Sequence, residues 1–212
     1  MKEILFANEH RRKHFEFFRQ MNHPHFSVTA NVNITRLSHE LKAKGRPFMP
    51  TVVWLVSDAA NSIPQFRQRI REEKVVEHEA VHPSFAIDTE VSDVFSFCEV
   101  KFQKDYQAFL QEAIATIEKT RKDPVFEDEP GRDDYLFLSS LPWVSFTAIT
   151  HAMRYHPHDS VPRITWGKYF RQSNEVMIPL SVQAHHALVD GRHVGQFFEK
   201  VEKLCAAPDN WL

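Results

Sequence analysis

The sequence predicts an α/β fold in which helices cover one side of a mixed β-sheet. Helical and strand-like segments alternate irregularly along the chain instead of in strict βαβ order, which favours such a sheet. Apolar residues make up 42 % of the chain, with 18 Phe, so a packed core is feasible. A length of 212 residues suits one core. We therefore expect a single domain over residues 1–212.

Five segments have the periodicity of a helix. Asn8 can cap the first, in which Phe15 and Phe18 share a face at a spacing of three. The third is apolar nearly all round and should be the most buried, and Pro64 stops it. The predicted helices are residues 8–20, 35–43, 50–62, 106–118 and 194–205.

Strand-like segments occur between these helices. Residues 26–34 alternate between apolar and polar side chains, which is typical of a strand with one buried face. Residues 67–74 are expected to form a turn, and the acidic segment 121–134 an exposed loop. The predicted strands are residues 26–34, 75–77, 84–87, 94–100, 136–140, 144–149, 164–170 and 176–184.

Composition and charge exclude several classes of function. The net charge of −2 gives no bulk attraction to nucleic acid or to an anionic membrane. With only 5 Gly, the chain has neither a GxGxxG nor a GxxxxGK[ST] motif. The N-terminus lacks the apolar region of a signal peptide, and the most apolar stretch, 48–60, is too short to span a bilayer. We expect a soluble, cytoplasmic protein without nucleic-acid or membrane partners.

The most informative segment is 180–198, where a strand ends in His185-His186 and turns at Asp190-Gly191 into a helix. A neutral imidazole can take a proton from a hydroxyl near pH 7, so His186 is a candidate general base. Asp190 can cap the following helix or accept a bond from a distant arginine. Spacing alone leaves His186 as a base, a metal ligand or a buried structural histidine, and favours the last.

Two other kinds of site have weaker support. Adjacent histidines on a strand point to opposite faces, and neither an HExxH motif nor a Cys–His ligand set occurs, so we expect no metal. A nucleophile elbow, GxSxG, is also absent, so His186 would act on a hydroxyl of the substrate. Ser139 ends a strand, where its hydroxyl can donate to an oxyanion or simply form a turn. The histidine sets weighed as metal ligands are His185, His186 and His193, and His151, His156 and His158.

Five segments taken together resemble the chloramphenicol acetyltransferase family of the CoA-dependent acyltransferase superfamily. The family signature has a glutamine, paired histidines, and an aspartate-glycine followed by a histidine, as in QAHHALVDGRHVG. The other four segments follow the family's order and spacing over nearly the whole chain. The five are Arg11–Phe18, Ser139–Phe146, Ile164–Tyr169, Ile178–Gln183 and Gln183–Gly195.

The resemblance implies a two-layer α/β sandwich that assembles as a homotrimer, with active sites at the subunit interfaces and acetyl-CoA as co-substrate. It implies that His186 is the general base for direct attack of an acceptor hydroxyl on the thioester, without an acyl-enzyme. Ser139 would donate to the oxyanion, and Thr165 would help to hold a water molecule. Asp190 would pair with Arg11 and so fix the loop that presents His186.

The same resemblance implies the binding residues. Tyr169 matches a position that lines the CoA site, and Arg46 lies near a basic position that meets a CoA phosphate. Phe18, Phe26, Phe95 and His151 fall in the acceptor pocket, where Phe18 replaces a common tyrosine and His151 is more polar than is usual. Expected activities are acetylation of chloramphenicol, as in antibiotic resistance, or of another hydroxyl compound. A catalytically idle trimeric binding protein is the remaining alternative.

Overall fold

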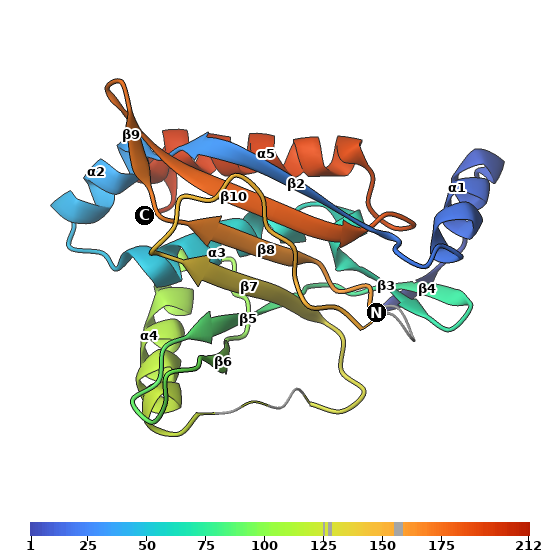
Figure 1. Cartoon of the computed structure of the whole chain (residues 1–212), viewed down its shortest axis with the longest axis horizontal. Coiled ribbons are helices and arrows are strands. Elements are labelled where there is room, and N and C mark those ends of the chain that lie inside the picture. Colours follow the sequence, from blue (N-terminus) through green and yellow to red (C-terminus); the bar gives the residue numbers. More distant parts are fainter. Residues whose placement is uncertain (125, 127–128, 155–158) are drawn as a thin grey trace.

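A computed structural model describes residues 1–124, 126, 129–154 and 159–212. Its main sheet has seven strands in the order β2-β10-β8-β7-β5-β6, with β9 paired to β10 (Figure 1). Strands β5, β7 and β8 run parallel and the other pairs are antiparallel, so the predicted mixed sheet is confirmed. The strands are β2 (His25–Asn33), β5 (His82–Ile87), β6 (Ser96–Glu99), β7 (Tyr135–Leu141), β8 (Arg163–Gly167), β9 (Phe170–Gln172) and β10 (Glu175–His185).

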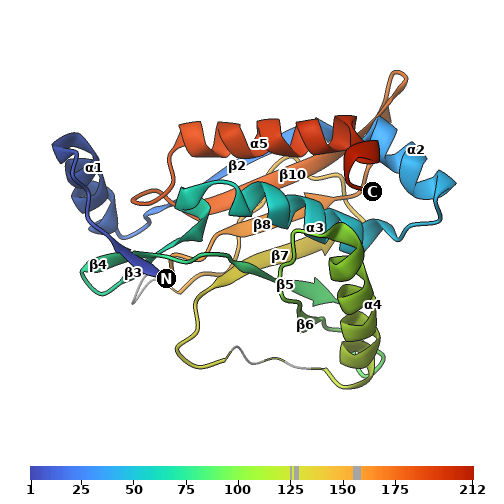
Figure 2. The same cartoon turned by 180° about the vertical axis from the view of Figure 1, so that it is seen from behind.

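Helices cover one face of this sheet, as predicted. Figure 2 shows α3 and α5 lying across the sheet, while α1 stands beyond the end at which β10 finishes. A small three-stranded sheet has the order β1-β4-β3. The remaining elements are α1 (Glu9–Arg19), α2 (Thr35–Ala43), α3 (Phe48–Asn61), α4 (Tyr106–Lys122), α5 (Gly191–Ala206), β1 (Lys2–Ile4), β3 (Gln68–Arg71), β4 (Lys74–Glu77), η1 (Pro64–Arg67) and η2 (Pro208–Asn210).

The hydrophobic core fills the space between the helices and the sheet. Helix α3 is buried along most of its length, which confirms the expectation from its apolar sequence. Leu138, Ile164 and Val182 are register partners on β7, β8 and β10, and all three belong to the core. Within the described residues, no helix is both long enough and apolar enough to cross a membrane.

The opposite face of the sheet carries polar side chains. Ser139, Thr165, Ser181 and Thr29 are successive register partners on β7, β8, β10 and β2. Because side chains of aligned residues point to the same side of a sheet, the four form a hydroxyl row across this face. The chain that follows β7 crosses the same face (Figure 1), so the row lies beneath residues 142–154.

The predicted strand at 144–149 is wrong, because these residues form irregular chain. They lie over a sheet face, where no strand edge is free, and bond to individual groups instead. The N–H of Lys168 donates to the Val144 carbonyl (2.9 Å), and the Ser145 hydroxyl donates to the Lys168 carbonyl (2.7 Å). Gly167 permits this approach, because a Cβ atom there would lie 2.6 Å from the Val144 oxygen.

Other boundaries also differ from the predictions. Residues 67–74, expected to be a turn, contain β3 and the start of β4, and β1 was not predicted. These three strands form the small sheet, and strands this short carry little periodicity. The predicted strand 164–170 is interrupted after Gly167, and β9 begins at Phe170.

Candidate functional site

His186 lies just beyond the end of β10, in a site walled by aromatic rings. Its ring stacks on Phe18, with ring centres 3.9 Å apart, and lies 4.5 Å from the ring of Phe26. Its backbone N–H donates to the Pro24 carbonyl (2.8 Å). The side chain remains 26 % exposed. The fully buried ring of His185 instead contacts His25. The two neighbouring histidine side chains therefore lie in different surroundings, as predicted.

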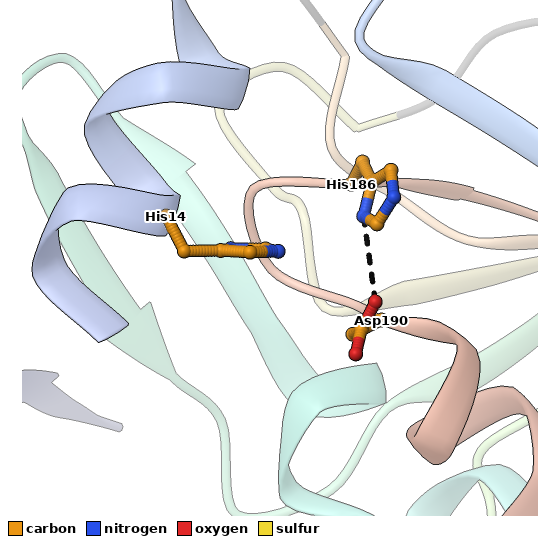
Figure 3. Close-up of side chains that lie close together, drawn as sticks. All are labelled: His14, His186 and Asp190. Atoms are coloured by element: carbon orange, nitrogen blue, oxygen red, sulfur yellow. Dashed lines mark ion pairs between the residues drawn. The ribbon is translucent and has the colours of Figure 1, made fainter. Parts of the chain in front are cut away.

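The Val189 carbonyl selects the tautomer of His186. Its oxygen lies 3.1 Å from Nδ1 of His186. Since a carbonyl oxygen only accepts, Nδ1 carries the hydrogen in the neutral ring and Nε2 keeps a lone pair. The Asp190 carboxylate lies 4.0 Å from the same Nδ1 (Figure 3). This arrangement leaves Nε2 able to accept a proton.

The predicted ion pair between Arg11 and Asp190 is wrong. Among the described residues, no ion pair joins these two side chains. The Arg11 guanidinium donates instead to the carbonyls of Ala187 (2.8 Å) and Leu188 (2.9 Å). Burial lowers the pKa of Arg11, and the charge of Asp190 raises it. Arg11 therefore holds the loop after His186 through backbone carbonyls rather than through the aspartate.

Asp190 is the N-cap residue of α5, one of the roles that its position allowed. Its backbone N–H donates to Nδ1 of His193 (3.0 Å), three residues further on. The N-terminus of the helix and the loop that presents His186 are thus joined.

His14 was missed in the sequence. Its ring lies 5.5 Å from that of His186 and 4.8 Å from that of Phe18, and its Nδ1 is 3.0 Å from the Arg11 guanidinium. A spacing of three residues from Arg11 places both on one face of α1, a signal that was available. Burial and the charge of Arg11 lower the pKa of His14, so the ring is neutral at pH 7.

Possible metal ligands do gather here, although not in the sets weighed from the sequence. Ligand atoms of His14, His186 and Asp190 lie within 4.8 Å of one another (Figure 3). The Arg11 guanidinium beside His14 opposes a cation at this point. His156 and His158, which belonged to one of the weighed sets, lie outside the described residues.

The predicted oxyanion donor and water-holding residue lie together, but away from His186. Ser139 and Thr165 are register partners on neighbouring strands, and Thr165 pairs with Ser181 of β10. His186 lies five positions beyond Ser181, which corresponds to about 16 Å along a strand. A single chain therefore brings Ser139 to Thr165 without bringing either to His186.

The four predicted acceptor-pocket residues fall in three places. Phe18 and Phe26 contact His186 directly. His151 lies on Thr165, with its Nε2 3.0 Å from Thr165 Oγ1. Phe95 is exposed and packs with Phe126 and with Phe97 of the edge strand β6, at the far side of the sheet from β2.

The predicted CoA residues lie near the start of α3. The Tyr169 ring is 59 % exposed, and its centre is 6.2 Å from that of Phe48. Arg46 is two positions before Phe48. Within the described part of the chain, the buried Nε of Arg46 has no hydrogen-bond partner. An open aromatic ring and a guanidinium with a free donor suit an adenine and a phosphate.

Comparisons with known proteins agree with this geometry. The family model for chloramphenicol acetyltransferase matches residues 2–202. The chain is 30% identical to "Chloramphenicol acetyltransferase 3" of Escherichia coli over 92% of each chain. It is 31% identical to a chloramphenicol acetyltransferase of Proteus mirabilis, over 92% of this chain and 90% of the relative.

Solved structures give the same result for the fold. A chloramphenicol acetyltransferase superposes with a TM-score of 0.85 at 26% identity, over 96% of this chain and 100% of the other. A dihydrolipoamide acetyltransferase of Azotobacter vinelandii shares the fold, with a TM-score of 0.69 at 19% identity over 99% of this chain and 93% of the other. The chain belongs to the chloramphenicol acetyltransferase family, a family of acyltransferase enzymes.

Proposed function

We propose that this enzyme transfers the acetyl group of acetyl-CoA to a hydroxyl of a small acceptor, with His186 as general base. The observation that carries the proposal is the tautomer of His186. The Val189 carbonyl holds the hydrogen on Nδ1, and Nε2 is left with a lone pair in a site walled by Phe18 and Phe26. A proton acceptor between aromatic rings suits an acceptor that has both a ring and a hydroxyl.

The proposed reaction is a direct attack on the thioester. Nε2 of His186 takes the proton of the acceptor hydroxyl while that oxygen bonds to the acetyl carbonyl carbon. The hydroxyl of Ser139 donates to the oxyanion that forms, and Thr165 holds a water molecule beside it. When the intermediate collapses, the C–S bond breaks and the CoA sulfur leaves with the proton from His186. No acyl-enzyme is formed.

The separation of His186 from Ser139 supports a site shared between two copies of the chain. One copy would supply His186, Phe18 and Phe26, and its neighbour would supply Ser139 and Thr165. A ring of three copies, the homotrimer implied by the family, would contain three such sites. Head-to-tail contacts form a ring when the rotation between neighbours closes, and in a ring of three each copy would give its histidine to one site and its serine to another.

The co-substrate would bind through Tyr169 and Arg46. The exposed ring of Tyr169 would stack on the adenine of acetyl-CoA, and the free Nε–H of Arg46 would donate to a phosphate. We propose that the reaction needs no metal, since the Arg11 charge opposes a cation beside His186. The enzyme would act in the cytoplasm.

Chloramphenicol is the first candidate acceptor, because the relatives carry its name and aromatic side chains line the site. Another hydroxyl compound is the second candidate, because polar groups occupy the sheet face opposite the helices. Arg163 pairs with Asp159 there (2.6 Å), and His151 lies on Thr165. A more polar acceptor would bond with these groups.

Release of free thiol from acetyl-CoA tests the proposal. We expect thiol release that depends on chloramphenicol or on another alcohol of a broad panel. Release with chloramphenicol supports the first acceptor, and release only with other alcohols supports the second. No release with any acceptor would contradict acetyl transfer and leave an idle binding protein of the same fold.

His186→Ala should lower turnover by about 10³-fold, because the only proposed base is lost. The matched control is His39→Ala, which removes an exposed histidine on α2 and should leave turnover unchanged. Thermal unfolding of both variants shows whether they are folded. Unchanged turnover in folded His186→Ala would remove His186 as the base.

A further inference from the structure

The imidazole of His151 contacts a residue that the proposed reaction uses. Its Nε2 lies 3.0 Å from Thr165 Oγ1, within hydrogen-bonding distance. Thr165 itself is completely buried in the middle of the sheet. A buried hydroxyl on a central strand has few possible partners, so the ring of His151 decides where this hydroxyl points.

The backbone around His151 is fixed by groups other than its ring. Its N–H donates to Oε1 of Gln183 on β10 (3.0 Å), and the hydroxyl of Ser27 donates to the Ile149 carbonyl (3.1 Å). Because Ser27 gives its only hydroxyl hydrogen to that carbonyl, Ser181 must donate to Ser27, 3.2 Å away. The segment is therefore held at two points by the polar face of the sheet.

His151 is neutral under ordinary conditions. Burial lowers its pKa, and the nearby charge of Arg163 lowers it further. A neutral imidazole has one nitrogen that donates and one that accepts, and a hydroxyl can do either. If Thr165 donates to Nε2, the bond fixes the torsion of its hydroxyl and leaves two lone pairs to accept; if Nε2 donates, the bond occupies one lone pair and confines the hydroxyl hydrogen to the two remaining directions.

We propose that His151 is a positioning residue that orients the Thr165 hydroxyl for acetyl transfer. The inference rests on the proposed function and adds a residue to it. The ring acts through Thr165, so its loss should lower turnover and not the binding of acetyl-CoA. Since Gln183 and Ser27 hold the backbone, removal of the ring should leave the segment in place.

A double-mutant cycle tests the inference. His151→Leu, Thr165→Val and the double variant are compared in the thiol-release assay with the best acceptor. We expect His151→Leu to lower kcat about tenfold in the wild-type background, with KM for acetyl-CoA unchanged, and less than about twofold in the Thr165→Val background. Thr165→Ser keeps the hydroxyl, so the tenfold effect should return in that background.

His151→Gln is the rescuing variant, since its amide reaches about as far as Nε2 and should recover part of kcat. Melting temperatures show that each variant is folded. An equal loss in the Thr165→Val and wild-type backgrounds, or no loss in either, would overturn the inference in an active enzyme. Absence of thiol release from the wild type would overturn the proposed function as well, so the two failures are distinguishable.

Discussion

The chemistry of His186 depends on three backbone carbonyls and one guanidinium. The Val189 carbonyl holds the ring tautomer, and Arg11 binds the carbonyls of Ala187 and Leu188 in the same loop. A planar guanidinium makes two diverging bonds at once, which a lysine cannot reproduce. The orientation of the proposed base is therefore set by backbone groups that Arg11 keeps in position.

Arg11→Ala should lower stability and turnover together. The variant loses two charge-assisted bonds to a buried loop, which should reduce the free energy of unfolding by about 2 kcal/mol. Melting temperature and thiol release measure the two effects. The control is Arg12→Ala, which removes an exposed neighbour on the same helix and should change neither. An Arg11→Ala variant as stable as wild type would show that these bonds contribute nothing to stability.

At the scale of the element, the chain between β7 and β8 determines which groups contact the polar face of the sheet. Residues 142–154 bond to Lys168, Gln183 and Ser27 instead of to a strand edge. This arrangement brings His151 onto Thr165 and lays the main chain close to Gly167. Residues 142–154 therefore cover the polar face of the sheet, and a few hydrogen bonds to that face hold them in place.

The sequence predicted the regular elements better than the contacts of this segment. Alternation and helical periodicity identify β2, β10 and α3, because each buries one continuous face. The bond between His151 and Thr165 has no such signal, since it joins an irregular chain to a strand across the sheet face. Likewise, the motif that placed Arg11 near Asp190 could not show that backbone carbonyls take its hydrogen bonds. The periodicity of apolar residues indicates which face of a helix or strand is buried. The contacts of His151 and Arg11 depend instead on how distant parts of the chain come together in the fold.

Gly167→Ala should displace the segment that covers the hydroxyl row. The new methyl group would lie 2.6 Å from the Val144 oxygen and 3.0 Å from a ring carbon of Phe146. Overpacking of this kind costs about 1–3 kcal/mol, so the melting temperature and turnover should both fall. The control is Gly195→Ala in α5, where a Cβ meets nothing within 4 Å and should stabilise the helix slightly. A Gly167→Ala variant with unchanged melting temperature and turnover would show that the segment can move aside without loss of stability or activity.

At the scale of the whole molecule, a partly buried charge network joins the small sheet to the start of β7. Arg71 makes two bonds to Asp133, at 2.7 and 2.8 Å, and Nε2 of His78 lies 2.8 Å from the same carboxylate. Burial alone would raise the pKa of Asp133, but the bonds from Arg71 and His78 hold that pKa well below its usual range. The bonds from Arg71 and His78 therefore stabilise the ionised form of Asp133.

This preference predicts a loss of stability in acid. A carboxyl with a lower pKa in the folded chain stabilises the fold fully above its unfolded pKa of about 3.9, and the stabilisation fades as the pH falls below that value. Asp133→Asn should melt earlier than wild type at pH 7, and the difference should shrink below about pH 3. Asp88→Asn, at an exposed position, should match wild type throughout. An unchanged gap between pH 7 and pH 3 would show that the network does not depend on the charge of Asp133.

The division of the site between two copies is the central claim, and mixing two inactive variants tests it most directly. His186→Ala and Ser139→Ala are each nearly inactive under the proposed mechanism. Co-assembled in equal amounts, random trimers should contain an intact histidine opposite an intact serine in about one quarter of their sites. We predict that thiol release recovers to about one quarter of the wild-type rate per site. Activity no higher than the mean of the two parents, in trimers shown to contain both variants, would contradict a shared site.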